Sequence, residues 1–163
     1  MKINIFFIST VTLLLIAVAH SCFEQKEPEL PPETQTGANT FGCYVNGVLL
    51  VPTYSGIIFD VPRLEASLYI YFQSGDSVLN IKSRGKNGDC SLFVLNPEEN
   101  IKKTLMRVTF TNDYRDYDGR DVGEIIITRF DTINRIFSGT FVVKNIGMTQ
   151  GRFDIRNLSI TKY

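Results

Sequence analysis

The densest group of hard oxygen donors in this 163-residue chain lies at residues 112–124. Asp116, Asp118 and Gly119 fit positions three, five and six of an EF-hand calcium loop. A tyrosine and an isoleucine then fall at positions one and twelve, so the ligand pattern fails at both ends. This run therefore predicts a surface loop closed by Asp118-Gly119, and we assign no metal site.

The same region offers carboxylates for glycoside hydrolysis, in which two acids about 5 to 9.5 Å apart share the work. Asp113, Asp121 and Glu124 are available, but no spacing pattern selects a pair among them. The only histidine is His20, so the chain that follows lacks the imidazole of Ser-His-Asp and Cys-His systems and of most zinc sites. We assign no catalytic residue and no cofactor, and we predict that the protein is not an enzyme.

Two tyrosines are candidates for a binding face. Tyr69 and Tyr71 alternate with Leu68, Ile70 and Phe72, which places both tyrosines on the outward side of one strand. Exposed aromatic rings can stack on sugars or anchor a partner protein. The competing interpretation is that these rings only cover the second face of a sheet.

The N-terminus has the order of a secretory signal. Lys2 is followed by an apolar run to Ala19, shorter than the roughly 20 apolar residues of a membrane-spanning helix. One cleavage site is the small-x-small pattern that ends at Ala19. The other, Ala19-His20-Ser21-Cys22, resembles the lipobox of bacterial lipoproteins, although a lipobox usually has Leu near the first position and a small residue at the second. We favour the lipobox, with residues 1–21 as signal peptide and a lipid on Cys22.

The cysteine count supports a lipid on Cys22. Three cysteines in an exported chain leave one odd thiol, and lipidation of Cys22 leaves Cys43 and Cys90 as a pair. A disulfide between them would close a loop of roughly 48 residues and stabilise the fold by about 4 kcal/mol on the chain-entropy model. Two separately buried thiols are the alternative, because both positions also suit inward-facing strand sites.

Residues 22–40 are predicted to form a lipid-anchored linker. Four glutamates and three prolines lie in this stretch, and apolar periodicity is missing. Prolines favour extended conformations and like charges repel, so this linker should hold the next domain away from the lipid as a semi-stiff spacer.

The chain without its signal is nearly neutral. Removal of Lys2 lowers the 17 Lys and Arg by one against an unchanged 17 Asp and Glu. A nucleic-acid binder would carry a basic excess or stripe, so we expect no nucleic-acid partner.

Residues 41–163 are predicted to form one domain built almost entirely of strands. Asn46-Gly47 is the strongest hairpin signal, because both residues tolerate the positive φ of a two-residue turn. Expected strands, including the alternating segments, are Phe41–Val45, Val48–Val51, Leu68–Phe72, Val78–Lys82, Cys90–Leu95, Leu105–Phe110, Val122–Phe130, Arg135–Lys144 and Gly151–Thr161.

Two finer features accompany these strands. The inward phase of the last strand changes between Ile155 and Leu158, which predicts a one-residue bulge near Arg156-Asn157. A short helical turn is expected at Pro97–Lys103, with Asn96 as its N-cap. Short strands without long crossovers predict an all-β fold: an antiparallel β-sandwich of about eight strands, with an up-and-down β-barrel as the alternative.

Several segments resemble a known family. They are Phe41–Gly47 with Val51-Pro52, Thr128–Asn134, Ser138–Phe141 and Gly151–Ile155. Together they resemble an uncharacterised family of small Bacteroidota lipoproteins, a domain of unknown function. The resemblance covers most of residues 41–163 and implies a β fold in the cell envelope, at the outer membrane, on its periplasmic side or at the cell surface. It supplies no site residues.

These features together predict a lipid-anchored, non-enzymatic module that binds an extracytoplasmic protein, glycan or small ligand. Its expected partners are the membrane, through the N-terminal lipid, and an envelope component. The alternative is a structural accessory of an envelope complex that pairs through a sheet edge. A carboxylate-based hydrolase is the third hypothesis.

Overall fold

The computed structural model describes residues 29–52, 64–85, 87–111 and 116–163. The predicted signal peptide, Cys22 and Asp113 lie outside these residues. In the described ranges the chain forms eleven strands and one short 3-10 helix, which confirms the all-β prediction with more strands than expected. The elements are β1 Thr40–Val45, β2 Val48–Leu50, β3 Leu64–Ile70, β4 Ser77–Gly85, β5 Gly88–Leu95, β6 Lys102–Thr111, β7 Asp116–Gly119, β8 Glu124–Asp131, β9 Ile136–Val143, η1 Lys144–Ile146, β10 Met148–Arg156 and β11 Ser159–Lys162.

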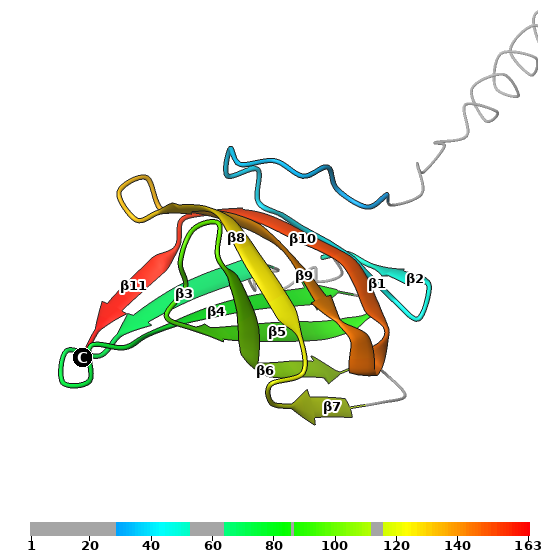
Figure 1. Cartoon of the computed structure of the whole chain (residues 1–163). Coiled ribbons are helices and arrows are strands. Elements are labelled where there is room, and N and C mark those ends of the chain that lie inside the picture. Colours follow the sequence, from blue (N-terminus) through cyan, green and yellow to red (C-terminus); the bar gives the residue numbers. More distant parts are fainter. Residues whose placement is uncertain (1–28, 53–63, 86, 112–115) are drawn as a thin grey trace, which may run out of the picture.

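All eleven strands belong to one sheet that curls into a half-barrel (Figure 1). The strand order is β11-β3-β4-β5-β6-β8-β9-β10-β1-β2, and β7 pairs with β6 beside this path. Every pair is antiparallel except β11 with β3, which is parallel. The fold is all-β, as predicted, and its strands are joined in one curled sheet that includes one parallel pair. The closed-barrel alternative is wrong, because β11 and β2 are the two separate ends of the strand order in the described part of the chain.

Strand β6 joins the two halves of this sheet. Its first residues, 102–104, pair with β8, whereas residues 105–111 pair with β5. The register with β5 shifts between Phe93 and Val94, opposite Met106, which is the geometry of a β-bulge. Bulges bend a strand, so β6 can belong to two layers. We call these the β4 layer (β11, β3, β4, β5, β7) and the β9 layer (β8, β9, β10, β1, β2).

The core lies between the two layers. Leu79 and Leu92 of the β4 layer and Ile125, Phe137 and Phe153 of the β9 layer are at most 2% exposed. Each such side chain contributes about 1.5–3 kcal/mol of transfer free energy. This core of buried side chains holds the two layers together.

The hairpin between β1 and β2 confirms the Asn46-Gly47 prediction. Both residues have positive φ, 50° at Asn46 and 82° at Gly47. This is the conformation of a type I′ turn, whose twist matches that of the flanking strands.

The helical turn predicted at Pro97–Lys103 is wrong. The segment forms no helix: Asn100 lies in a turn with a φ of 58°, and β6 already begins at Lys102. Asn100 donates its backbone N–H to the carbonyl of Ile127 over 2.7 Å, and Glu99 forms an isolated bridge with the same residue. Pairing with a distant strand has overridden a weak local helix signal.

The phase change near Arg156-Asn157 is present, but its predicted cause is wrong. Asn157 has a φ of 65° and separates β10 from β11, so the strand is broken and not bulged. Leu158 remains fully buried between the two strands. The chain then crosses from the β9 layer to the β4 layer and pairs with β3.

Residues 29–39, which we call the strap, lie on the outer face of the β9 layer (Figure 1). The outer side of Gly42 is filled by Pro31, whose Cδ would come within 2.6 Å of any Cβ at this position. The second half of the predicted linker is thus part of the folded domain. Its backbone groups find side-chain partners on the sheet, which composition alone does not reveal.

Candidate functional site

The structure places Tyr69 and Tyr71 where the sequence predicts them, on the outward side of β3 and its continuation. Ala66 and Leu68 point into the core and are 6% and 2% exposed. Their neighbours in the alternation therefore face solvent on the outer side of the β4 layer.

A third tyrosine, the last residue of the chain, joins this pair. Strand β11 runs parallel to β3 with Thr161 opposite Tyr69, which brings Tyr163 beside Tyr71. The ring of Tyr163 is stacked on both: its centroid is 5.5 Å from that of Tyr71 and 6.2 Å from that of Tyr69. The backbone of Tyr163 fixes this position, since it donates to Ile70 and accepts from Phe72.

Strands β4 and β5 extend the same surface with aliphatic side chains. In the sheet register Tyr69 lies opposite Val78, and Val78 lies opposite Leu95. Residues opposite each other share a face, so these side chains form one continuous row. We call Tyr69, Tyr71, Val78, Leu95 and Tyr163 the aromatic face.

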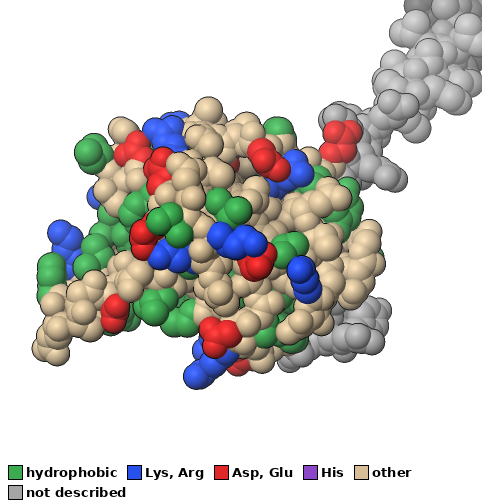
Figure 2. Space-filling view, in the orientation of Figure 1, with side chains coloured by type: hydrophobic (Ala, Val, Ile, Leu, Met, Phe, Trp, Pro, Cys, Tyr) green, Lys and Arg blue, Asp and Glu red, His purple; other side chains and the backbone are tan. Residues whose placement is uncertain are grey.

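The aromatic face is open. Tyr163 is 63% exposed, Leu95 42% and Tyr71 40%, and Phe72 is exposed at the adjoining rim. Figure 2 shows hydrophobic side chains at the surface around β11 and at several other places on this side, among intermixed Lys, Arg, Asp and Glu.

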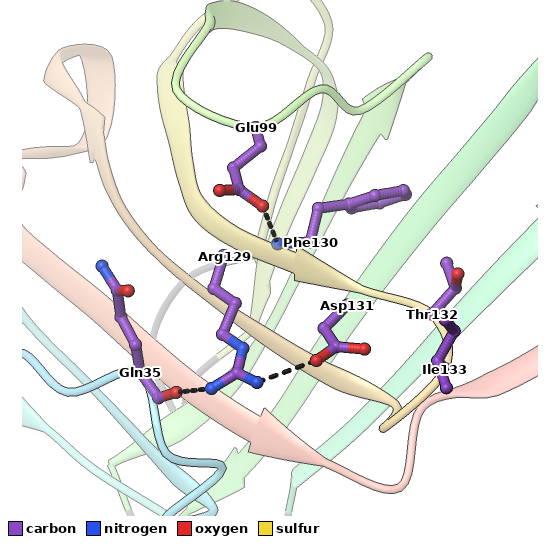
Figure 3. Close-up of a pocket in the computed structure, with 7 residues that line it drawn as sticks. All are labelled: Gln35, Glu99, Arg129, Phe130, Asp131, Thr132 and Ile133. Atoms are coloured by element: carbon purple, nitrogen blue, oxygen red, sulfur yellow. Dashed lines mark hydrogen bonds and ion pairs between the residues drawn. The ribbon is translucent and has the colours of Figure 1, made fainter.

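A second candidate is an open polar groove of about 450 Å³ at the end of β8 (Figure 3). Arg129 bridges two of its walls: one guanidinium nitrogen donates to the backbone oxygen of Gln35 in the strap, and the other donates to Asp131 over 2.8 Å. The carboxylate of Glu99 accepts the backbone N–H of Phe130 over 2.9 Å.

The acids of this groove are engaged in holding local structure. Asp131 accepts hydrogen bonds from the side chain and the backbone N–H of Asn134, which close the hairpin to β9. Hydrogen bonds from Asn134, and then the one from Arg129, hold the pKa of Asp131 well below its usual range. A general acid needs the opposite shift, so this geometry does not equip Asp131 for proton donation.

The carboxylates singled out in the sequence are dispersed. Asp118 lies in β7, where the sequence predicted a loop, and pairs with Arg107; this hydrogen bond lowers its pKa. Glu124 begins β8 and pairs with Lys102 over 2.9 Å, which lowers its pKa as well. Asp121 is exposed, with a φ of 51°. In the described residues no group of three or more His, Cys, Asp or Glu side chains could hold a metal ion.

Cys43 and Cys90 are free thiols in the core. Burial raises the pKa of Cys43 to about 12. Burial raises the pKa of Cys90 well above its ordinary value, and the charges of Cys43 and Asp89 raise it further. The disulfide is not formed in this structure and stays a prediction for the oxidised protein.

Comparison with known proteins identifies no relative. No protein-family model, no curated protein and no solved structure matches the chain. Among the residues that the structure describes, no helix is long and apolar enough to cross a membrane.

Sequence reasoning found two of the five residues of the aromatic face. It missed Tyr163, because a parallel pairing between the C-terminal strand and β3 joins residues about ninety positions apart. It also missed Val78 and Leu95, although both lie in predicted strands. Their outward phase was readable from the alternation with Leu79 and Val94, but not their place beside the tyrosines.

Proposed function

We propose that this chain is a lipid-anchored, non-enzymatic module of the cell envelope whose aromatic face binds an extracytoplasmic protein. The observation that carries the proposal is the continuous row from Tyr163 to Leu95 on the outer side of the β4 layer. Single exposed apolar side chains are ordinary, but an exposed cluster marks an interaction site. The anchor and the location rest on the sequence features of residues 1–22.

The chemistry of the face favours a protein over a glycan. Leu95 and Val78 carry no hydrogen-bonding groups with which to read sugar hydroxyls. The ring of Tyr163 is stacked against two neighbours, which leaves less flat ring surface for a sugar. Exposed aromatic side chains with few charged neighbours are typical of the centre of a protein interface.

Site-specific photo-crosslinking in intact cells tests this proposal. A photoreactive residue at Leu95 is expected to give a discrete crosslinked protein band, which a second substitution, Tyr71→Ser, removes. Ile133 is the matched control, because it is 91% exposed but lies outside the aromatic face. A photoreactive residue there is expected to give no such band.

Two outcomes would contradict the proposal. Equal crosslinking from Leu95 and Ile133 would mean that the aromatic face has no partner of its own. Binding of the purified domain to protease-treated envelopes, lost on Tyr71→Ser, would identify a glycan as the ligand.

The second candidate is pairing through the edge of the sheet, and the position of β11 favours it. Strand β11 ends the strand order in the described part of the chain. Tyr163 directs its backbone groups to β3, so the alternate residues Lys162 and Ile160 direct theirs outward, where a partner strand could add. Lys162→Pro removes one outward N–H, and loss of the crosslinked partner in this variant but not in Thr161→Val would establish strand addition.

A further inference from the structure

The strap and the aromatic face lie on opposite sides of the domain. The strap covers the outer face of the β9 layer, and the aromatic face is the outer face of the β4 layer, with the core between them (Figure 1). The described chain therefore begins, at Glu29, on the side away from the aromatic face.

A buried carboxylate holds the strap. Asp154 of β10 points outward from the sheet but is only 1% exposed, because the strap covers it. It accepts backbone N–H groups from Thr36, Gly37 and Ala38 over 3.0, 2.8 and 3.1 Å. It also accepts the hydroxyls of Thr34 and Ser138, each over 2.6 Å.

Three arginines hold the carbonyl groups of the same segment. Arg152 donates to the backbone oxygen of Pro31 over 3.1 Å and Arg156 to that of Thr36 over 2.7 Å. Arg129 donates to Gln35 in the same way. The sheet thus satisfies both the donors and the acceptors of the strap backbone, which a loosely attached spacer would leave to water.

Docking of the strap shortens the free tether. Residues 22–29 span at most about 25 Å, whatever their conformation, whereas residues 22–40 could span about 60 Å if the strap were detached. A short tether that starts from one face restricts how the domain can turn relative to the surface that holds the lipid.

We propose that the strap orients the domain on the membrane: the outer face of the β9 layer faces the lipid surface, and the aromatic face points away from it. This inference rests on the lipid anchor at Cys22 in the proposed function. It adds that the strap presents the aromatic face to a partner that approaches from the aqueous side.

Energy transfer to a labelled membrane tests the orientation. The full-length lipidated protein is placed in vesicles of phosphatidylethanolamine and phosphatidylglycerol that contain acceptor-labelled lipid. A donor fluorophore is attached through an unnatural amino acid at Gln150, an exposed residue beside the strap, or at Leu95. We expect higher transfer efficiency from Gln150 than from Leu95, and a ratio near one in Asp154→Asn.

The outcomes separate this inference from the proposed function. Equal efficiencies from Gln150 and Leu95 in the unaltered, lipidated protein would overturn the orientation alone. An unequal ratio that survives in Asp154→Asn and in Arg156→Gln, a second strap variant with milder effect on folding, would overturn the role of the strap. Fatty-acid labelling that does not depend on Cys22 would remove the anchor itself. Loss of the crosslink from Leu95 would contradict the proposed partner and would leave the proposed orientation valid.

Discussion

The two outer faces of the half-barrel differ in composition and in whether the chain itself covers them. The outer face of the β9 layer carries Asp154 and three arginines, and the chain's own strap covers it. The outer face of the β4 layer carries Tyr69, Tyr71 and Leu95 and is bare in the described part of the chain.

This contrast shows which side chains a sheet face needs to bind a backbone segment and which it needs to bind the side chains of a partner. A backbone segment can lie on a sheet only where polar side chains match its N–H and C=O groups, because unmatched buried backbone groups are costly. A face with tyrosines and aliphatic side chains offers few such partners and suits the apolar side chains of another molecule. The predictions below test the difference between the two faces, from the largest expected effect to the smallest.

The largest expected effect on stability comes from a disulfide that would link the β9 layer to the β4 layer. Cys43 lies in β1 of the β9 layer and Cys90 in β5 of the β4 layer. If oxidation joins them in the native protein, reduction should lower the free energy of unfolding by about 4 kcal/mol. Urea unfolding with and without reductant measures this, and Cys43→Ala with Cys90→Ala is the insensitive control. An intact mass that shows two free thiols in the protein isolated without reductant would contradict the disulfide.

Loss of the buried charge should detach the strap. Asp154→Asn replaces an acceptor oxygen with a donor that faces the strap N–H groups, so we expect the free energy of unfolding to fall by about 3 kcal/mol. Hydrogen exchange should also accelerate at Gly37 and Ala38, which donate to this carboxylate. Asp121→Asn, an exposed change of the same type, should leave both measurements nearly unchanged. Equal effects of the two variants would show that the strap is not held by Asp154.

Acid should weaken the strap-covered face selectively. Burial raises the pKa of Asp154, but hydrogen bonds from Ser138, Thr34, Ala38 and Gly37 outweigh it, and the net pKa lies well below the ordinary value of 3.8. A carboxyl with a lowered folded-state pKa stabilises the fold above its unfolded pKa and loses this contribution as pH falls toward the folded value.

The measurement is the difference between two proteins. Between pH 4 and pH 3 the unaltered protein should lose about 1 kcal/mol more than Asp154→Asn, since one additional proton is taken up on unfolding. Other carboxylates with lowered pKa, such as Asp131, titrate in both proteins and cancel. Identical pH dependence of the two proteins would contradict the assignment.

Substitution on the aromatic face should change the free energy of unfolding least. Leu95→Ser removes an exposed side chain, so the free energy of unfolding should change by less than about 0.5 kcal/mol. With the photoreactive residue moved to Val78, which lies opposite Leu95 on the same face, this variant should nevertheless lose the crosslinked protein partner. A fall in stability similar to that of Asp154→Asn would mean that the aromatic face is part of the packing and not a binding surface.

Local sequence signals determined much of the fold. Alternation located most strands, and Asn46-Gly47 fixed the first hairpin, because side-chain period and turn conformation are properties of a few adjacent residues. The outward direction of Tyr69 and Tyr71 followed in the same way. These features depend on the geometry of a few adjacent residues, which stays the same whichever strands become neighbours in the tertiary structure.

Tertiary structure alone decided what those elements meet. The parallel pairing of β11 with β3 brought Tyr163 to Tyr71, and the bend of β6 made one curled sheet from what resembled a sandwich. The strap changed from an expected spacer into a docked segment because Asp154, more than a hundred positions away, supplied its acceptor. Pairing partners at such separations are chosen by the packing of the whole sheet, and no local pattern in the strap or in β10 encodes them.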